Sequence, residues 1–398
     1  MLKSRLRGKL NGKRGASKTF VSLFIAATFA LLLSMPDVAI DYMKKGLQLC
    51  AHSVVPSLFP FMIISELIVF SGMGKSISRF ISPLTKKLFG VGESGACAFL
   101  LGTLCGFPVG AGAAASMYDV GDLSSDELER VMTFCNNPSP AFVISTVGAS
   151  IIGKRNVGVV IYACVVISAI TVGIFSNVLS NTKRQTTRED RAKRTEQDIP
   201  LPQVFTNAVR HSATSMLTVC AYVAFFSTLV GCLGCVLGAF GGARTLVTLL
   251  FGFFELSSGA ASAAGLGDAY ACAIACALFS GWSGLSVHFQ IMSVTAGRGL
   301  SYKSYILSKA AQGILCAAIC AAVLKFMFPS LHSESTNAFP VIDTLLTFER
   351  GDLVCLSFVA ASACTLIVGL RKKEKYHGKI SLTKARLCDT IHCNIRTH

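Results

Sequence analysis

Long apolar stretches recur along this chain, separated by short polar connections. Each stretch is near the ~20 residues that a helix needs to cross the hydrocarbon core of a bilayer. The pattern therefore predicts an all-α polytopic membrane protein. The expected membrane stretches are 19–35, 47–72, 96–117, 131–152, 157–179, 206–231, 243–262, 270–295, 304–328 and 352–370.

Two of these stretches are interrupted at the same relative position by a glycine–aromatic sequence. The first breaks at Cys105–Gly110 (Cys-Gly-Phe-Pro-Val-Gly) and the second at Ser280–Gly284 (Ser-Gly-Trp-Ser-Gly). Hydrocarbon cannot satisfy open backbone groups, so a broken helix survives only where it lines a buried or watered cavity. Matching breaks in two halves of a chain are typical of transporters that bind solute near the membrane midplane. We expect about eight full spans and two broken or re-entrant segments, 96–117 and 270–295. The alternative is that all ten stretches cross fully, which would put the basic loop 180–205 outside.

The two halves also share short identities in the same order. Aligning 47–72 with 206–231 pairs His52 with His211, and aligning 95–107 with 270–282 pairs Gly106-Phe107 with Gly281-Trp282. The segments are rich in alanine, so chance agreement is the alternative to duplication. With 96–117 and 270–295 re-entrant, 47–72 and 206–231 run in opposite directions, which predicts an inverted repeat.

Basic residues are concentrated outside the apolar stretches. Seven Lys/Arg lie in the first 18 residues, six in 183–194 and eight in 371–398. We expect the protein to lie in a bacterial cell membrane, and the positive-inside rule then places both termini on the cytoplasmic side. The expected organisation is a basic cytoplasmic arm (1–18), a transmembrane anchor (19–35), a first repeat (47–179), a charged cytoplasmic linker (180–205), a second repeat (206–329), an external loop (330–351), a last transmembrane helix (352–370) and a basic cytoplasmic tail (371–398).

Composition agrees with this class of protein. The chain is 52% hydrophobic and 15% charged, with mean hydropathy +0.58, whereas a soluble domain carries roughly 25% charged residues. The net charge of +16 flanks apolar spans rather than forming one basic face, so we expect the lipid bilayer and a small solute as partners and no nucleic acid. Most of the 16 cysteines lie among apolar residues, as small buried side chains do, and we expect no structural disulfides.

The first break carries residues suited to an anion. Proline is favoured in the first turn of a helix, so Pro108 is expected to open a helix through Val109–Ser116, with Gly106, Phe107, Pro108 and Gly110 as part of the solute site. A helix that starts in mid-membrane directs unpaired N–H groups and positive partial charge into the site. The alternative is that the glycines and alanines here serve close helix packing.

A second polar interruption lies at Cys135–Pro140, with the sequence Cys-Asn-Asn-Pro-Ser-Pro. Two prolines cannot continue the backbone hydrogen bonds, and they force the preceding residues toward extended geometry. Asn136, Asn137 and Ser139 then lie beside unwound backbone, where polar groups are costly unless paired or bound to a ligand. This motif is expected to bind solute or a coupling ion.

Glu255 follows an apolar run and is followed by Ser257 and Ser258. An ionisable residue within a membrane segment is a functional candidate, here for coupling to a proton or sodium ion. Near the interface it would only be solvated. Glu66 is a weaker candidate of the same kind.

Around the second break, Gly281, Trp282 and Ser283 are expected to bind solute, together with His288 and Gln290 one or two turns later. The alternative for the last two is hydrogen-bonded packing.

Other polar residues have ordinary explanations. Lys309 and Lys325 are expected to snorkel toward the interface, and Ser124 or Ser125 is placed to cap a helix that begins near Asp126. No P-loop, nucleophile elbow or zinc-type spacing occurs, so no enzyme activity, metal site or cofactor is predicted. A homo-oligomer is compatible with the sequence.

At Leu101–Gly110, Phe134–Pro140 and Gly281–His288 the chain resembles the nucleoside-recognition (Gate) family of membrane proteins, over roughly 45–325. The resemblance implies re-entrant hairpins and broken helices that bind solute, as in concentrative nucleoside carriers, and its sporulation branch is associated with moving dipicolinate. The chain departs from the family at Glu255, where a Thr/Asn-Gly pair is expected to follow the glutamate.

Together these patterns predict a secondary-transporter-like protein that moves a small polar or anionic solute by alternating access. A non-transporting membrane scaffold or assembly factor for the spore envelope is the alternative.

Overall fold

The computed structural model describes residues 19, 21–71, 73, 78–179, 200–239, 244–333 and 336, and no strand occurs among them. The chain divides into two units, Met1–Ala39 with Phe348–His398 and Ile40–Thr347. The expected arm 1–18, most of the linker 180–205 and of the loop 330–351, the helix 352–370 and the tail 371–398 lie outside the described residues.

The helices of the described residues confirm the all-α class. In order they are α2 (Pro36–Leu49), a π-helical stretch (Cys50–Val54), α3 (Val55–Phe70), α5 (Ser82–Phe89), α6 (Glu93–Leu104), α7 (Val109–Asp119), α8 (Ser125–Met132), a second π-helical stretch (Phe142–Ile151), α9 (Arg155–Leu179), α10 (Leu201–Ala239), α11 (Arg244–Phe254), α12 (Leu256–Ala263), a 3-10 turn (Ala264–Leu266), α13 (Ala269–Trp282), α14 (Gly284–Val294), α15 (Tyr302–Met327) and a last 3-10 turn (Pro329–Ser333).

Four described helices are long and apolar enough to cross a membrane. They are Arg155–Leu179, Pro202–Gly238, Ala269–Val294 and Tyr302–Met327, and a fifth arises if Val21–Ser34 and Pro36–His52 count as one span. The count of about eight full spans is therefore not confirmed. Other apolar stretches form helices of only 10–17 residues, and the expected helix 352–370 lies outside the described residues.

The first glycine–aromatic break joins two helices that fold back on each other. A Cβ added to Gly102 on α6 would lie 3.0 Å from the Cα of Gly110 on α7. Eight residues of straight helix would separate these positions by about 12 Å. Residues 93–119 therefore form a hairpin, as the re-entrant interpretation of 96–117 expects.

The second hairpin does not lie where the sequence predicts it. Residues 270–295 form α13 and α14, which continue as one span of 26 residues, Ala269–Val294. Instead, α11 and α12 fold back on each other, and a Cβ added to Gly259 would meet the Cα of Gly252. The re-entrant expectation for 270–295 is wrong because a break at Ser283 interrupts the helix without reversing its direction, whereas Gly252 and Gly259 permit two helices to approach closely.

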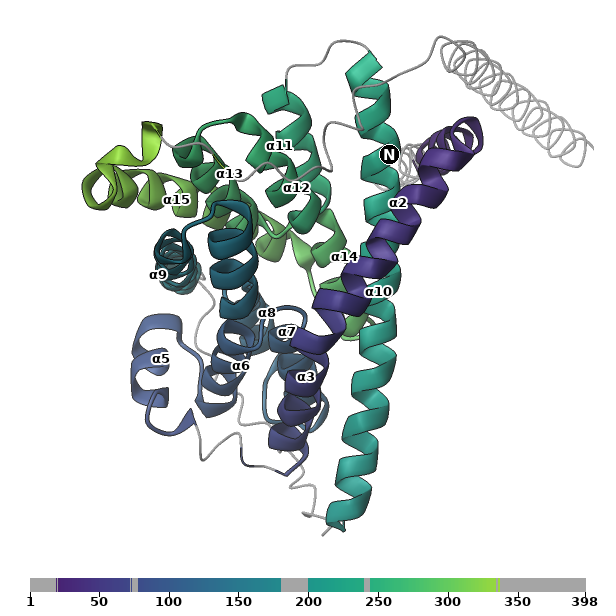
Figure 1. Cartoon of the computed structure of the whole chain (residues 1–398). Coiled ribbons are helices and arrows are strands. Elements are labelled where there is room, and N and C mark those ends of the chain that lie inside the picture. The colour runs from purple at the N-terminus through teal and green to yellow at the C-terminus, as the bar shows by residue number, and fades with distance from the viewer. Residues whose placement is uncertain are drawn as a thin grey trace, which may run out of the picture. The chain divides into compact units, whose positions relative to one another are not determined.

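The described elements recur in the same succession. A hairpin (α6–α7), an interrupted segment (α8, 133–141, Phe142–Ile151) and a long helix (α9) are followed, after α10, by a hairpin (α11–α12), an interrupted segment (α13–α14) and a long helix (α15). Figure 1 shows α10 alongside both groups, with α3 near one end of it and α11 near the other.

Local signals explain several of these boundaries. Ser124 caps α8, since its side chain accepts from the Glu127 N–H while the Glu127 carboxylate accepts from the Ser124 N–H, which confirms the predicted cap. α10 begins at Leu201, so the end of the expected linker 180–205 is helical.

Phe107 packs against both large hydrophobic cores, one built mainly from α6–α8 and the other from α9, α13 and α15.

Candidate functional site

The first break is held against the second polar interruption by a glycine. Gly106 has φ +90°, and a Cβ there would lie 2.8 Å from the Ser139 nitrogen. Gly102 and Gly110 both face the Cys135 carbonyl. The hairpin α6–α7 therefore contacts the unwound segment 133–139 through main-chain atoms, and any side chain at these glycines would separate the two.

The predicted asparagines are fully buried in that unwound segment. Each amide donates to the end of the preceding helical turn, Asn136 Nδ2 to the Met132 carbonyl at 3.2 Å and Asn137 Nδ2 to the Phe134 carbonyl at 3.0 Å. Ser139 Oγ accepts from the Phe142 N–H at 3.2 Å and so begins the next helical stretch. These polar groups therefore stabilise the break itself.

Two residues of α15 complete this cluster. Lys309 donates to the Asn136 carbonyl at 2.7 Å and to Gln312 Oε1 at 2.7 Å, while Gln312 donates to Asn137 Oδ1 at 2.8 Å. Lys309 has no exposed surface, so the expectation that it snorkels is wrong. Lys325, on the same helix, is exposed as expected.

Glu255 separates α11 from α12 with an extended backbone and is 3% exposed. Its carboxylate accepts from the Ser257 N–H at 3.0 Å and from the Ser258 N–H at 2.6 Å. The glutamate therefore fills the N-terminus of α12, where a negative charge is favoured. The two serines contribute their backbone N–H groups to this cap.

The break between α13 and α14 lies directly against Glu255. Ser283 and Gly284 both have positive φ, at 78° and 82°. A Cβ on Gly284 would lie 3.0 Å from the Leu256 nitrogen and 3.2 Å from the Glu255 Cα. Ser283 is buried. A positive-φ glycine therefore lies at both contacts between a hairpin and an interrupted segment, Gly106 in the hairpin of the first half and Gly284 in the interrupted segment of the second.

The aromatic residues of the two breaks have different partners. Trp282 stacks on Phe253 with centroids 5.4 Å apart and donates from Nε1 to the Phe253 carbonyl at 3.0 Å. The described contacts do not pair it with Phe107. A Cβ on Gly281 would lie 2.7 Å from the Gly313 Cα, so Gly281 serves the packing of α13 on α15.

The polar residues after the second break are buried and bonded. His288 Nδ1 lies 2.7 Å from the Tyr305 hydroxyl, and Gln290 donates to Ser286 Oγ at 3.2 Å. Tyr305 precedes Lys309 by one turn of α15. One face of this helix therefore reaches both the His288 side of the second half and the asparagine segment of the first.

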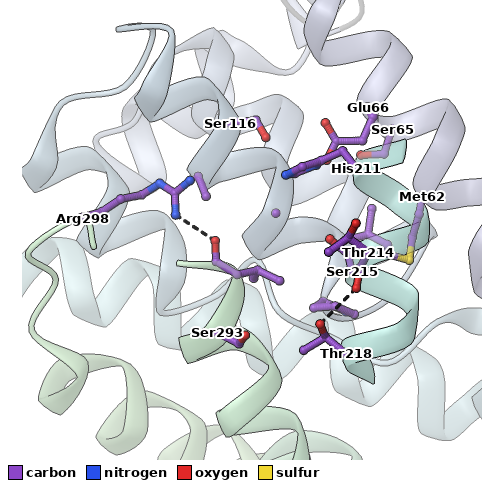
Figure 2. A pocket seen from close by; sticks show the side chains of 15 residues that line it. Met62, Ser65, Glu66, Ser116, His211, Thr214, Ser215, Thr218, Ser293 and Arg298 are labelled. Carbon is purple, nitrogen blue, oxygen red and sulfur yellow. Dashed lines mark hydrogen bonds and ion pairs between the residues drawn. The ribbon is translucent and has the colours of Figure 1, made fainter. Parts of the chain in front are cut away.

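A cavity of about 280 Å³ opens beside the first break. Its wall comes from α3, α7, α10 and α14, and it extends along α7 from Ser116 to Pro108. Figure 2 shows Glu66 of α3 beside His211 of α10, with Arg298 across the cavity.

Charged groups on this wall are paired. Glu66 Oε1 lies 2.7 Å from His211 Nδ1, and Arg298 Nε donates to Asp119 Oδ1 at 2.9 Å. Of the candidates predicted from the sequence, Pro108 and Glu66 line the cavity, whereas Asn136, Glu255 and His288 lie in the contacts between breaks. Sequence reasoning did not identify Lys309, Gln312 and Arg298 as site residues. Lys309 and Gln312 are recognised only by their burial against the asparagine segment, and Arg298 only by its place in the cavity wall.

Comparison with known proteins supports the membrane class. The chain is 24% identical over 352 residues to the protein named sporulation integral membrane protein YlbJ of Bacillus subtilis, which covers 81% of this chain and 86% of that protein. No family model and no solved structure matches the chain. This similarity and the long apolar helices identify a multi-pass membrane protein that resembles a protein of sporulation.

Proposed function

We propose that this protein moves a small polar, anionic solute across a bacterial membrane by alternating access. The observation that carries the proposal is that a hairpin contacts an interrupted segment in both halves, at Gly106–Ser139 and at Gly284–Glu255. Interrupted helices are costly in hydrocarbon and are retained where they line a binding site. Two such pairs in one chain supply the two gates that alternating access needs.

The arrangement supports an inverted repeat, with pairs of elements different from those expected from the sequence. The succession of elements matches the hairpin α6–α7 with α11–α12, and the asparagine segment with the Ser283 break. The asparagine motif then has a structural counterpart in the second half. This match replaces the pairing of Gly106 with Gly281.

Contacts at the helix ends support hairpins that enter from opposite sides. Arg298 contacts Asp119, Ser301 contacts Glu129, and Asn177 contacts Leu88, so these connections share one end of the second unit. At the far ends of α10 and α15, Arg244 contacts Gly265, and Thr336 contacts Ala264. The basic linker follows α9 at the first of these ends. The positive-inside rule then favours a cytoplasmic location for that end and, because 1–18 and 371–398 are also basic, for both termini.

The cavity supports solute entry from the cytoplasmic side. It begins near Arg298 and ends at Pro108 and Val109, where α7 starts. No side chain of the described residues caps that helix start, so its N–H groups favour an anion. The equivalent position on α12 is occupied by the Glu255 carboxylate.

A planar aromatic dicarboxylate such as dipicolinate fits this chemistry, and a nucleoside is the second solute class that we propose. Transport of this kind involves no chemical step and no cofactor other than a coupling ion. Purified full-length protein in liposomes should take up labelled dipicolinate or nucleoside with saturation. Folded protein that shows no saturable flux of either would refute the proposal.

The second candidate function is a membrane scaffold or assembly factor for the spore envelope. The name of the similar protein, which refers to sporulation and the membrane alone, favours it. A scaffold should keep its function in the Asn137→Ala and Glu255→Gln variants and lose it when the linker or tail is deleted. A transporter should show the opposite pattern in a sporulation complementation assay.

A further inference from the structure

A fully buried lysine is directed at the unwound segment of the first half. Lys309 Nζ lies 2.7 Å from the Asn136 main-chain carbonyl and 2.7 Å from Gln312 Oε1. Both partners are neutral oxygens. Within the described part of the chain, Lys309 forms no ion pair.

The surroundings do not supply a counter-charge. The titratable side chains that interact electrostatically with Lys309 are the thiols of Cys135 and Cys316 and the imidazole of His288. An ammonium group without a carboxylate partner is expensive to bury. Hydrophobic packing alone would favour an apolar side chain here, so the oxygen atoms that the amino group contacts must account for a lysine at this position.

The ligands of this ammonium group are of the kind that bind a metal cation. Main-chain and amide carbonyl oxygens are ligands for hard cations, and unwound backbone carbonyls hold coupling ions in transporters. Further acceptors lie in the same cluster. Asn136 Oδ1 is buried without a hydrogen-bond partner among the described residues, and Asn137 Oδ1 accepts from Gln312 at 2.8 Å.

We propose that the Lys309 ammonium group occupies, as a built-in cation, the position that a monovalent metal ion would otherwise take at the unwound residues 136–139. It ties α15 to that segment through Asn136 and Gln312. The coupling consequence rests on the proposed transport function: solute movement needs neither sodium nor potassium ions. The occupancy of the site by Lys309 does not depend on transport.

Thermal unfolding of purified full-length protein in detergent tests the occupancy without any solute. The melting temperature is measured at constant ionic strength in choline, lithium, sodium and potassium chloride. Wild-type protein should melt at the same temperature in all four salts. A saturable rise with any of the metal ions in the wild type would overturn the proposal, because the site would then still accept a metal ion.

The Lys309→Ala variant removes the built-in cation and leaves its oxygen ligands. It should melt lower than the wild type in choline and recover by about 5 °C in saturating sodium or potassium, as a bound ion stabilises the folded state. Lys325→Ala, on the exposed part of the same helix, is the matched control and should show no ion response. Adding Gln312→Leu to Lys309→Ala should abolish the recovery.

The remaining outcomes are decisive as well. A Lys309→Ala variant that folds only when purified in sodium or potassium supports the proposal. A variant that fails to fold in every salt, or melts equally in all four, contradicts it. If the ion response appears but liposomes show no solute uptake, the proposed transport function is wrong while the built-in cation stands.

Discussion

The sharpest prediction concerns two glycines that lie two residues apart on α7. A Cβ added to Gly110 would lie 2.5 Å from the Cys135 carbonyl oxygen and 2.7 Å from the Gly102 Cα. Both are main-chain atoms, so no rotamer change relieves the contact. A Cβ added to Gly112 would meet nothing within 4 Å. The Gly110→Ala and Gly112→Ala variants therefore compare the same chemical change with and without the hairpin contact.

The magnitudes follow from two opposing effects. Alanine in place of glycine favours a helix interior by about 1 kcal/mol, whereas overpacking costs typically about 1–3 kcal/mol and occasionally more. Because the atoms around Gly110 belong to the backbone, we expect the upper part of that range. Gly110→Ala should lower the free energy of unfolding by about 2 kcal/mol, and Gly112→Ala should raise it by up to about 1 kcal/mol.

The free energies of unfolding of both variants and the wild type are measured by equilibrium unfolding in mixed micelles, with circular dichroism as the signal. The expected difference between them is about 3 kcal/mol, which is far outside the scatter of such measurements. Equal stability of the two variants would show that α6, α7 and the Cys135 carbonyl do not meet as described. That result would remove the hairpin contact on which the proposed function rests.

Three further predictions concern the buried network, the Glu255 cap of α12 and the cavity. Asn137→Ala deprives Gln312 of its 2.8 Å acceptor and should cost about 1–3 kcal/mol of stability, while Asn156→Ala on an exposed position of α9 should stay within about 0.5 kcal/mol of the wild type; equal losses in denaturant midpoints would contradict the network. Glu255→Ala removes the acceptor of two N–H groups at the start of α12 and should cost about 1 kcal/mol, with Glu255→Gln losing less in the same unfolding experiment. Gly112→Leu places a side chain in the cavity wall and should abolish solute uptake in liposomes while the protein keeps its melting temperature; undiminished uptake would exclude this cavity as the solute path.

Sequence patterns predicted the class of the protein and the positions of its breaks. Hydropathy, glycine and proline are local signals, and a proline pair interrupts backbone hydrogen bonds wherever it lies. The segment 135–140, the hairpin turn at Gly106–Pro108 and the cap at Ser124 could therefore be located without coordinates. Glu255 was found for the same reason, since a carboxylate in an apolar run is rare.

The direction of the chain after each break could not be predicted in this way. Gly252 and Gly259 allow α11 to fold back on α12, whereas Ser283 and Gly284 interrupt a span that continues. Both segments contain glycine and aromatic residues at similar density. Only contacts between residues distant in the sequence separate a hairpin from a broken span.

The sequence by itself determined a multi-pass helical membrane protein with interrupted helices, because a segment that spans hydrocarbon must be composed almost entirely of apolar residues. The tertiary structure alone decided that each hairpin contacts an interrupted segment, that Lys309 is buried on Asn136 rather than directed to the interface, and that Glu66 meets His211 beside a cavity. These facts depend on which helices lie next to one another. A lysine near the end of an apolar stretch has the same sequence pattern whether it reaches water or a carbonyl of another segment.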